Sequence, residues 1–247
     1  MNSIIILAAG MGTRLTTGIK KNNIPKCLVE LNNSKTILGL NMENILSSSE
    51  IKHIYLVTGY KHKLVEDFLS TTFPYQQNIK IVHNPNYSNS VIYSVKKGFE
   101  NIDDDGSVLL LNGDTYFEKD VFSQAKKISQ QDKNTITLFG HITNQFYDDD
   151  MLINVVESKI RTVGKNIKEA NGISSGAILM CNRGLQKYRD TINFESVDKF
   201  KTHHGILQFI RNSGFDIDFV ELGSINWFEV DDKEDLYRAR KHFDHSE

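Results

Sequence analysis

A glycine-rich loop that ends in an arginine follows the first apolar run of the chain. Residues 7–15 read LAAGMGTRL, with Gly10, Gly12 and Arg14 directly after the run Ile4–Ala9. Glycines allow backbone amides to approach a bound group without an intervening Cβ, and a guanidinium grips phosphate with a planar fork of donors. A loop of this composition after a strand could therefore bind the phosphates of a nucleotide.

Three interpretations of this loop compete on the residues alone. A Walker A loop requires Gly-Lys-Ser/Thr, whereas the chain has Arg14-Leu15-Thr16. A dinucleotide-binding fingerprint requires a third small residue where Leu15 stands, although Glu30 falls near the expected acidic position. The third interpretation is a tight strand-to-helix turn with an arginine that faces solvent. The loop by itself does not decide among them.

The rest of the chain alternates between short apolar runs and amphipathic helical patterns. Strands are predicted at 4–9, 53–60, 79–84 and 107–114, and helices at 36–48, 62–69, 92–100 and 120–128. This alternation predicts an α/β fold, a single doubly wound and mostly parallel Rossmann-like sheet covered by helices. A small irregular β-rich segment is expected from about Thr135 to Cys181, laid over one edge of the sheet. Ligands of such sheets bind beyond the carboxyl ends of the strands, which is where the glycine loop should lie.

The C-terminal stretch 226–243 reads as a strand that leads into a helix. Asp232 is the expected N-cap, and Leu236, Ala239 and Phe243 fall on one helical face. This helix is therefore expected to pack against the core through that face.

Composition excludes several classes of protein. The 247 residues carry a formal net charge of −2, which lacks the basic excess expected of a nucleic-acid-binding protein. No stretch approaches the roughly 20 apolar residues of a membrane span, and no signal peptide is recognisable, so a cytoplasmic location is predicted. Cys27 and Cys181 are isolated and are expected to be buried thiols.

A second element, PKCLVEL at Pro25–Leu31, strengthens the phosphate-binding interpretation. Together, LAAGMGTRL and PKCLVEL resemble the paired signature of nucleotidyltransferases that activate phosphorylated small molecules, L-A-[AG]-G-x-G-[ST]-R-[LM] followed by P-K. The resemblance continues in LLLNGDTYF (109–117) and NWFEVDDKEDLYRA (226–239), and is looser from Asn134 to Asn212. It implies one domain over 1–247, with a nucleotide-binding half (1–133) and an acceptor-binding, metal-completing half (134–247).

The resemblance also implies roles for individual residues. Arg14 would bind the β- and γ-phosphates, and Lys26 would lie between the α-phosphate and the incoming acceptor phosphate. These two cations are the predicted catalytic residues. The other predicted nucleotide-binding positions, around the loop and in the strand predicted at 107–114, are Leu7, Ala8, Ala9, Gly10, Gly12, Thr13 and Asn112.

A magnesium ion is implied by the same resemblance, because a hard cation that bridges phosphate oxygens prefers carboxylate ligands. Asp114 would be the first ligand and Asp231 the second, with Glu229 as an alternate or additional ligand. Taken alone, Asp114 could instead belong to a β-turn and Asp231 could cap a helix.

The segment NPNYSNSVIYSVKKG at 84–98 resembles the base-binding stretch of the branch that makes CDP-linked products, the phosphocholine and 2-aminoethylphosphonate cytidylyltransferases. The L-G-T-A motif usual in sugar-1-phosphate enzymes is absent. Asn84, Asn89 and Ser94 are the candidate base contacts, although Asn89 or Ser90 could simply cap a helix.

The sequence thus predicts a magnesium-dependent cytidylyltransferase that transfers CMP from CTP to a small phosphate or phosphonate acceptor and releases pyrophosphate. The alternative on the same fold is a sugar-1-phosphate nucleotidyltransferase, and a nucleotide-binding regulatory module and an NAD-dependent oxidoreductase are more distant. The expected product would enter cell-surface polysaccharide or phosphonate biosynthesis. A homodimer is compatible with the sequence, which does not fix the oligomeric state.

We expect the acceptor to carry a compact cationic group, such as choline or an amine, in addition to its phosphate or phosphonate. Aromatic faces attract quaternary ammonium groups, and carboxylates add a longer-range pull. The candidates are Phe146 and Tyr147 with Asp148-Asp149-Asp150, then Tyr116 with Phe117, and Trp227. The plain alternative is a solvated acidic loop and aromatic rings packed in the core.

Overall fold

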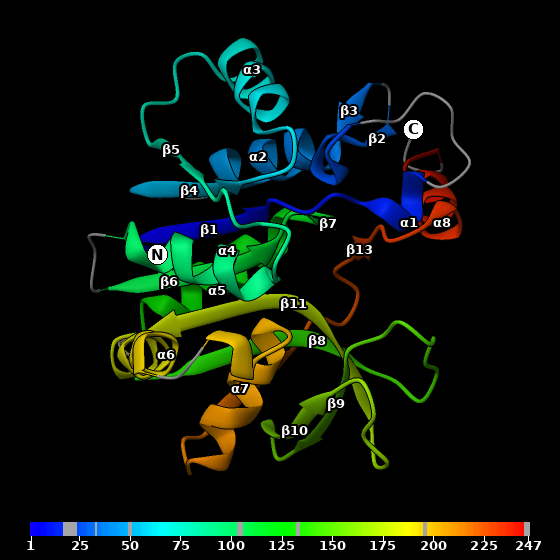
Figure 1. Cartoon of the computed structure of the whole chain (residues 1–247). Helices are drawn as coiled ribbons and strands as arrows, with labels where there is room; N and C mark the ends of the chain where they lie inside the picture. The colour runs from blue at the N-terminus through cyan, green and yellow to red at the C-terminus, as the bar shows by residue number, and fades with distance from the viewer. Residues whose placement is uncertain are drawn as a thin grey trace.

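The computed structural model describes residues 1–16, 24–32, 34–48, 51–102, 106–131, 134–194 and 197–244. Within these residues the largest element is a nine-stranded sheet (Figure 1). In order across the sheet, its strands are β5 (Ile79–His83), β4 (His53–Thr58), β1 (Ser3–Ala8), β6 (Ser107–Asn112), β11 (Gly172–Cys181), β8 (Ile136–Ile142), β12 (Ile217–Glu221), β10 (Lys159–Gly164) and β9 (Leu152–Val156). Two small antiparallel sheets pair β2 (Glu30–Asn32) with β3 (Lys35–Thr36) and β7 (Thr115–Phe117) with β13 (Trp227–Glu229).

Helices cover both faces of the main sheet. They are α1 (Thr13–Thr16), α2 (Ile37–Ser48), α3 (His62–Thr72), α4 (Val91–Glu100), α5 (Lys119–Ser129), α6 (Arg183–Phe194), α7 (His203–Asn212) and α8 (Lys233–Asp244), with short 3-10 turns η1 (Lys26–Leu28) and η2 (Val197–Lys199). Along β1, Ile5 faces the core cluster that contains apolar residues of α4, α6 and α7, whereas Ile4 and Ile6 face the cluster that contains those of α2, α3 and α5. The doubly wound arrangement is therefore confirmed.

The first half of the chain follows the prediction closely. Strands β5, β4, β1 and β6 pair in parallel, and the predicted helices between them correspond to α2, α3 and α4. All six residues of β1 are buried, as expected for a strand with helices on both faces. The carboxyl ends of these strands consequently meet at one edge, where β1 delivers the glycine loop.

The second half corrects two details of the prediction. Parallel pairing is not general: β11 runs antiparallel to both β6 and β8, and β10 is antiparallel to β9 and β12, while β8 and β12 are parallel. Nor does the 135–181 segment lie over one edge, since β8 and β11 are inner strands and only β9 and β10 form the far edge. The reason is that β8 to β11 follow one another without an intervening helix, and such short connections favour antiparallel pairing.

The short strand β7 is held by a buried asparagine from α2. Asn41 donates from Nδ2 to the carbonyl of Thr115 at 2.7 Å and accepts through Oδ1 from the amide of Phe117 at 2.9 Å. The other side of β7 pairs with β13. Asn41 thereby satisfies backbone groups that β13 does not reach, and it fixes the strand that directly follows Asp114.

Helix α8 begins as the sequence predicts. Oδ1 of Asp232 accepts from the amides of Glu234 at 2.8 Å and Asp235 at 3.0 Å, which makes Asp232 the N-cap. Asp235 reciprocates, because its Oδ2 accepts from the amides of Asp231 and Asp232 at 2.9 and 3.1 Å. Leu236, Ala239 and Phe243 are buried in a third core cluster with Tyr116 of β7. The start of α8 is therefore fixed beside β7.

Both cysteines are buried and free, as predicted. Burial raises the pKa of the Cys27 thiol to about 12 and that of Cys181 to about 11, so both remain protonated packing groups at neutral pH. Across the described ranges, none of the helices combines the length and the apolar character needed to cross a membrane.

Replacing Asn41 tests the support of β7. Asn41→Leu should lower the free energy of unfolding by about 2–3 kcal/mol, because it leaves a buried carbonyl and a buried amide without partners. Urea denaturation followed by circular dichroism measures the change. Glu43→Gln, at an exposed position of the same helix, is the matched control and should change stability by less than about 0.5 kcal/mol. Equal stability of Asn41→Leu and the parent would contradict this assignment.

Candidate active site at the carboxyl ends of the parallel strands

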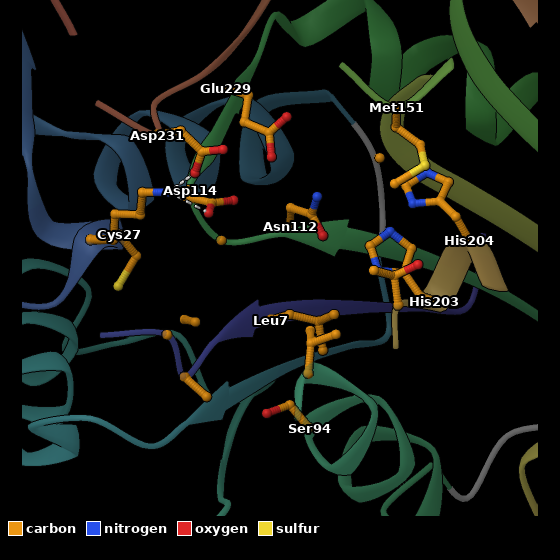
Figure 2. A pocket seen from close by; sticks show the side chains of 18 of the residues that line it. Leu7, Cys27, Ser94, Asn112, Asp114, Met151, His203, His204, Glu229 and Asp231 are labelled. Atoms are coloured by element: carbon orange, nitrogen blue, oxygen red, sulfur yellow. Dashed lines mark hydrogen bonds and ion pairs between the residues drawn. The ribbon is translucent and has the colours of Figure 1, made fainter. Parts of the chain in front are cut away.

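A cleft of about 390 Å³ opens beyond the carboxyl ends of β1 and β6 (Figure 2). The first half of the chain contributes Leu7, Ala8, Ala9, Gly10, Arg14, Lys26, Cys27, Tyr87, Val91, Ser94, Asn112, Gly113 and Asp114. The second half contributes Asp149, Met151, Lys165, Ser174, Gly176, Thr202, His203, His204, Glu229 and Asp231. The fold thus brings most of the predicted site residues to one place, together with residues that the sequence did not single out.

The two glycines of the loop have different reasons to be glycine. Gly10 lines the cleft, and a Cβ there would meet nothing within 4 Å, so the side facing the cleft is open. Gly12 has φ +63°, and a Cβ would lie 3.1 Å from Cβ and Cγ of Lys26. Gly12 is not among the cleft-lining residues, so its contribution is to let the lysine stem pass close to the loop. The side chain of Thr13 lies outside the described part of the chain.

Asp114 is positioned by the turn between β6 and β7. The amide of Gly113 donates to the carbonyl of Leu7 at 3.0 Å, and a Cβ on Gly113 would lie 2.6 Å from that oxygen. A side chain at position 113 would therefore push the turn away from β1. The amide of Val230 donates to the carbonyl of Asp114 at 3.0 Å, which ties the segment after β13 to the same turn.

Three carboxylates converge where these segments meet. Each of the three side chains, Asp114, Glu229 and Asp231, can offer one carboxylate oxygen, and these three oxygens lie within 4.8 Å of one another. Figure 2 shows the three side chains on one side of the cleft. Three closely spaced carboxylate oxygens are a donor set that fits a hard divalent cation. The residues predicted to bind metal are therefore brought together, including Glu229.

Lys26 lies between two of these carboxylates. Its Nζ is 2.9 Å from Oδ2 of Asp114 and also pairs with Oδ1 of Asp231. Burial acts against the ammonium, but the two carboxylates outweigh it and raise the pKa of Lys26. The same lysine, together with Arg14, outweighs the burial of Asp231 and lowers the pKa of that carboxyl. The ammonium thus remains charged although the side chain of Lys26 is only 10% exposed.

Glu229 has a different charge environment. Burial, followed by the negative charges of Asp114 and Asp231, raises its pKa to about 8. This environment therefore favours the protonated form of the carboxyl. A divalent cation bound among the three groups would favour the ionised form.

Arg14 joins the loop to two segments of the second half of the chain. One guanidinium nitrogen is 2.7 Å from Oδ2 of Asp231, and the other pairs with Asp149. The side chain of Arg14 is 55% exposed, so it can turn toward a ligand more easily than the buried Lys26. Lys165 lies near the same Asp149, with its Nζ 3.8 Å from the carboxylate.

The predicted base-binding segment is only partly in the cleft. Ser94 lines it and accepts a hydrogen bond from Nδ2 of the buried Asn84 at 2.9 Å. Asn84 acts behind Ser94, and its Oδ1 holds the amide of Asn86 at 3.0 Å. Asn89 is exposed and is not among the cleft-lining residues, so its predicted contact is not supported. Ser90 is the N-cap of α4, which confirms the alternative that this segment begins a capped helix.

The aromatic residues expected to bind a cationic acceptor group do not line the cleft. Tyr116 and Phe117 are buried in core clusters, and Trp227 packs against the core with its ring stacked on His141. Tyr147 lies under the guanidinium of Arg238, 4.8 Å from its ring centroid. The expected contact between these rings and an acceptor group is therefore not supported, because Tyr116, Phe117 and Trp227 pack in or against the core and Tyr147 pairs with Arg238.

Phe146 is 39% exposed and lies outside the cleft lining. Within the acidic run, Asp150 accepts from the amide of Tyr147 at 2.7 Å, and Asp149 reaches the cleft through its pair with Arg14. Asp148 is exposed and is not a lining residue. The run is thus a solvated loop with one member, Asp149, at the site.

Sequence reasoning missed much of the far wall of the cleft. The missed residues lie in the loosely similar region, where no motif marked them: Lys165 directly after β10, Ser174 in β11, and His203 and His204 in α7. The only available signal was the Thr-His-His triplet at the start of an apolar helical pattern. Tyr87 was also missed. It packs on Gly59, and a Cβ built on Gly59 would lie 2.5 Å from the Cβ of Tyr87.

A glycine-rich loop, two cations and three carboxylates gather at the carboxyl edge of this α/β sheet. Such a set of groups suits nucleotidyl transfer, and the comparisons with known proteins identify the chain as a nucleotidyltransferase. The chain belongs to the family of MobA-like NTP transferase domains, whose sequence profile matches residues 4–145. No curated protein matches the chain significantly.

Solved structures of nucleotidyltransferases share the fold over nearly the whole chain. The inositol-1-phosphate CTP transferase from T. maritima superposes with a TM-score of 0.79 at 19% identity, covering 98% of this chain and 95% of that one. The CTP:phosphocholine cytidylyltransferase from Streptococcus pneumoniae gives 0.73 at 19% identity, covering 98% of both chains. A UDP-glucose pyrophosphorylase in complex with UDP-glucose gives 0.80 at 13% identity, covering 100% of both. At these identities the likeness establishes the fold alone.

Removing one carboxylate charge tests the acidic cluster. Asp114→Asn and Asp231→Asn should each lower nucleotidyl transfer by at least about a hundredfold, because each weakens the group of charges that holds a divalent cation and Lys26. Asp232→Asn is the matched control: it removes a neighbouring charge, yet asparagine is an equally good N-cap, so turnover should stay near that of the parent. Full turnover in Asp114→Asn would remove this residue from the site.

The two cations should separate kinetically. Lys26→Ala should mainly lower kcat, because the lysine is fixed among the carboxylates where phosphate charge must be crowded, whereas Arg14→Ala should mainly raise the KM for the nucleotide. Steady-state pyrophosphate release measures both parameters, with Lys35→Ala as an exposed-lysine control and circular dichroism to verify folding. An unchanged kcat in Lys26→Ala with only a raised KM for the nucleotide would contradict the assignment.

Proposed function

We propose that the protein is a magnesium-dependent cytidylyltransferase that transfers CMP from CTP to a small phosphorylated or phosphonate acceptor. The observation that carries the proposal is the placement of Lys26 between Asp114 and Asp231 in the cleft beside the glycine loop. A fixed cation next to a carboxylate set is the arrangement required where two polyanionic substrates must meet.

In the proposed reaction, an oxygen of the acceptor phosphate forms a bond to the α-phosphorus of CTP while the bond from that phosphorus to the bridging α–β oxygen breaks. Pyrophosphate carries away the electron pair of the broken bond. Lys26 neutralises charge where the two phosphates approach, and the exposed Arg14 exchanges its carboxylate partners for the leaving phosphates. No protein nucleophile is needed.

Asp114, Asp231 and Glu229 would hold the magnesium ion, since their oxygens converge within 4.8 Å. When bound, the ion supplies positive charge to the phosphate oxygens and so stabilises the transition state. The carboxylates also hold Lys26 in its extended position, a contribution that belongs to the protein itself.

We assign the nucleotide to residues 1–133 and the acceptor to residues 134–247. The glycine loop, Ser94 and Asn112 lie on the first side of this division, and Met151, Lys165 and Ser174 on the second. Lys165 is a cation at the acceptor side that could meet an acceptor phosphate. The cytoplasmic location, the absence of a nucleic-acid partner and the homodimer remain predictions from the sequence.

The choice of CTP rests on the resemblance of residues 84–98 to the cytidylyltransferase branch, and on Ser94, which Asn84 orients at the cleft wall. That branch favours phosphocholine-like or 2-aminoethylphosphonate-like acceptors. The alternative is a sugar-1-phosphate nucleotidyltransferase that makes an NDP-sugar, and proteins of both kinds share the fold.

A substrate matrix tests this proposal. Pyrophosphate release should be at least about tenfold faster with CTP than with UTP, because a site built around the cytosine amino group leaves a polar group unpaired when uracil binds. The matrix crosses the four nucleoside triphosphates with phosphocholine, 2-aminoethylphosphonate, glycerol phosphate and sugar 1-phosphates. Activity should vanish with chelator and return with magnesium. Equal rates with CTP and UTP would count against the cytidylyltransferase branch.

A further inference from the structure

Two adjacent histidines lie in the wall of the cleft and have no role in the chemistry assigned above. His203 and His204 open helix α7 behind its N-cap Thr202, and they are only 5% and 4% exposed. Figure 2 shows the two rings with Met151 on the opposite side of the cleft from the three carboxylates. The pair therefore belongs to the acceptor side of the proposed division.

His203 has no hydrogen-bond partner at either ring nitrogen among the residues that the structure describes. Its neighbour differs, since Nε2 of His204 lies 2.8 Å from the hydroxyl of Ser174. The centroids of the two imidazole rings are 4.2 Å apart. A buried polar ring without partners has lost its hydration and gained nothing in return, so a group bound in the cleft is the natural source of the missing hydrogen bonds.

Both rings are neutral at physiological pH. Burial lowers the pKa of His203 to about 4. Burial, followed by the cost of charging a second ring beside His203 and near Lys165, lowers the pKa of His204 well below its ordinary value. A neutral imidazole offers one N–H donor and one nitrogen acceptor. The pair therefore presents both kinds of hydrogen-bonding atom and no charge.

This combination distinguishes among acceptor groups. A quaternary ammonium has no hydrogen-bond donor and would leave both nitrogens of His203 unpaired. A primary ammonium would lose its hydration beside an uncharged ring, and a phosphate offers acceptors only. A hydroxyl both donates and accepts, so it alone among these groups can pair with whichever nitrogen it meets.

We propose that His203 and His204 recognise a hydroxyl group of the acceptor, so that the acceptor is a polyol or sugar phosphate rather than a phosphate ester of choline or of an amine. Because both nitrogens of His203 are buried in the ligand-free chain, this recognition requires the ring to turn about its Cβ–Cγ bond and present a nitrogen to the cleft. This inference rests on the proposed function, because it concerns the second substrate of the same reaction. Within that reaction it replaces the cationic acceptor that the sequence favoured by a hydroxylated one.

Matched acceptors provide the test. With CTP and magnesium, kcat/KM is measured for glycerol 3-phosphate against propyl phosphate and for inositol 1-phosphate against cyclohexyl phosphate, with phosphocholine as the cationic comparison. In at least one pair, the kcat/KM of the hydroxylated acceptor should exceed that of its partner by about tenfold or more. This is the size of effect expected when a buried donor or acceptor loses its hydrogen-bond partner. Phosphocholine should be the poorer substrate.

Variants of His203 connect this preference to the ring. His203→Phe keeps a ring of similar size and removes both nitrogens, so the preference within the pair should fall to less than about threefold while the KM for CTP stays unchanged. His203→Gln keeps a donor and an acceptor and should restore part of the preference. Thermal unfolding of the ligand-free proteins gives a readout independent of activity: His203→Phe should melt at or above the temperature of the parent, because it removes unpaired buried nitrogens.

The outcomes separate this inference from the proposed function. Cytidylyl transfer to phosphocholine in preference to every hydroxylated acceptor would overturn the hydroxyl subsite and leave the proposed function standing. An undiminished hydroxyl preference in a folded His203→Phe would also overturn it. Absence of pyrophosphate release with CTP and every acceptor would overturn both.

Discussion

The site depends on one electrostatic arrangement, a nearly buried lysine held between two aspartates. The side chain of Lys26 is 10% exposed and that of Asp231 is 14% exposed, so neither charge is stabilised mainly by water. Removing either partner from such a pair leaves a buried charge uncompensated, which is more destabilising than the pair is stabilising. Burial, followed by the charges of Asp114 and Asp231, raises the pKa of Glu229 even though Lys26 acts in the opposite direction. The cleft is therefore prepared for one more cation.

Apolar packing is what keeps these charges close together. Asp114 follows β6, whereas Glu229 and Asp231 arrive more than a hundred residues later, so their meeting requires tertiary structure. The pairing of β7 with β13 provides the backbone connection. The third core cluster then fixes α8 against β7, with the rings of Tyr116 and Phe243 5.1 Å apart. Buried rings and aliphatic side chains thus hold the three carboxylates close together, because the carboxylates themselves repel one another.

The sequence predicted the features that depend on residues close together in the chain. Runs such as Ile4–Ala9 and the Asp232 cap depend on neighbouring residues, and they appear in the structure as predicted. The insertion of β11 between β6 and β8 depends on pairings between distant segments, and no local pattern encodes it. Residue type was likewise insufficient for Trp227, because an aromatic ring near a site and an aromatic ring in the core look alike in a sequence. His203 was overlooked for the converse reason, since its lack of partners exists only in the folded chain.

Under the proposed function, the two sides of the cleft use different physical means of recognition. Phosphates are attracted by charge, so Arg14 and Lys26 suit almost any triphosphate and almost any phosphorylated acceptor. Charge of this kind gives binding and rate without distinguishing what is attached to the phosphate. Discrimination among acceptors requires groups whose hydrogen bonds are completed by one partner and left open by another. Such groups must be buried and incompletely paired before the substrate binds, which lowers the stability of the free protein. The unpaired ring of His203, on the wall that carries neither the glycine loop nor the carboxylates, meets that requirement.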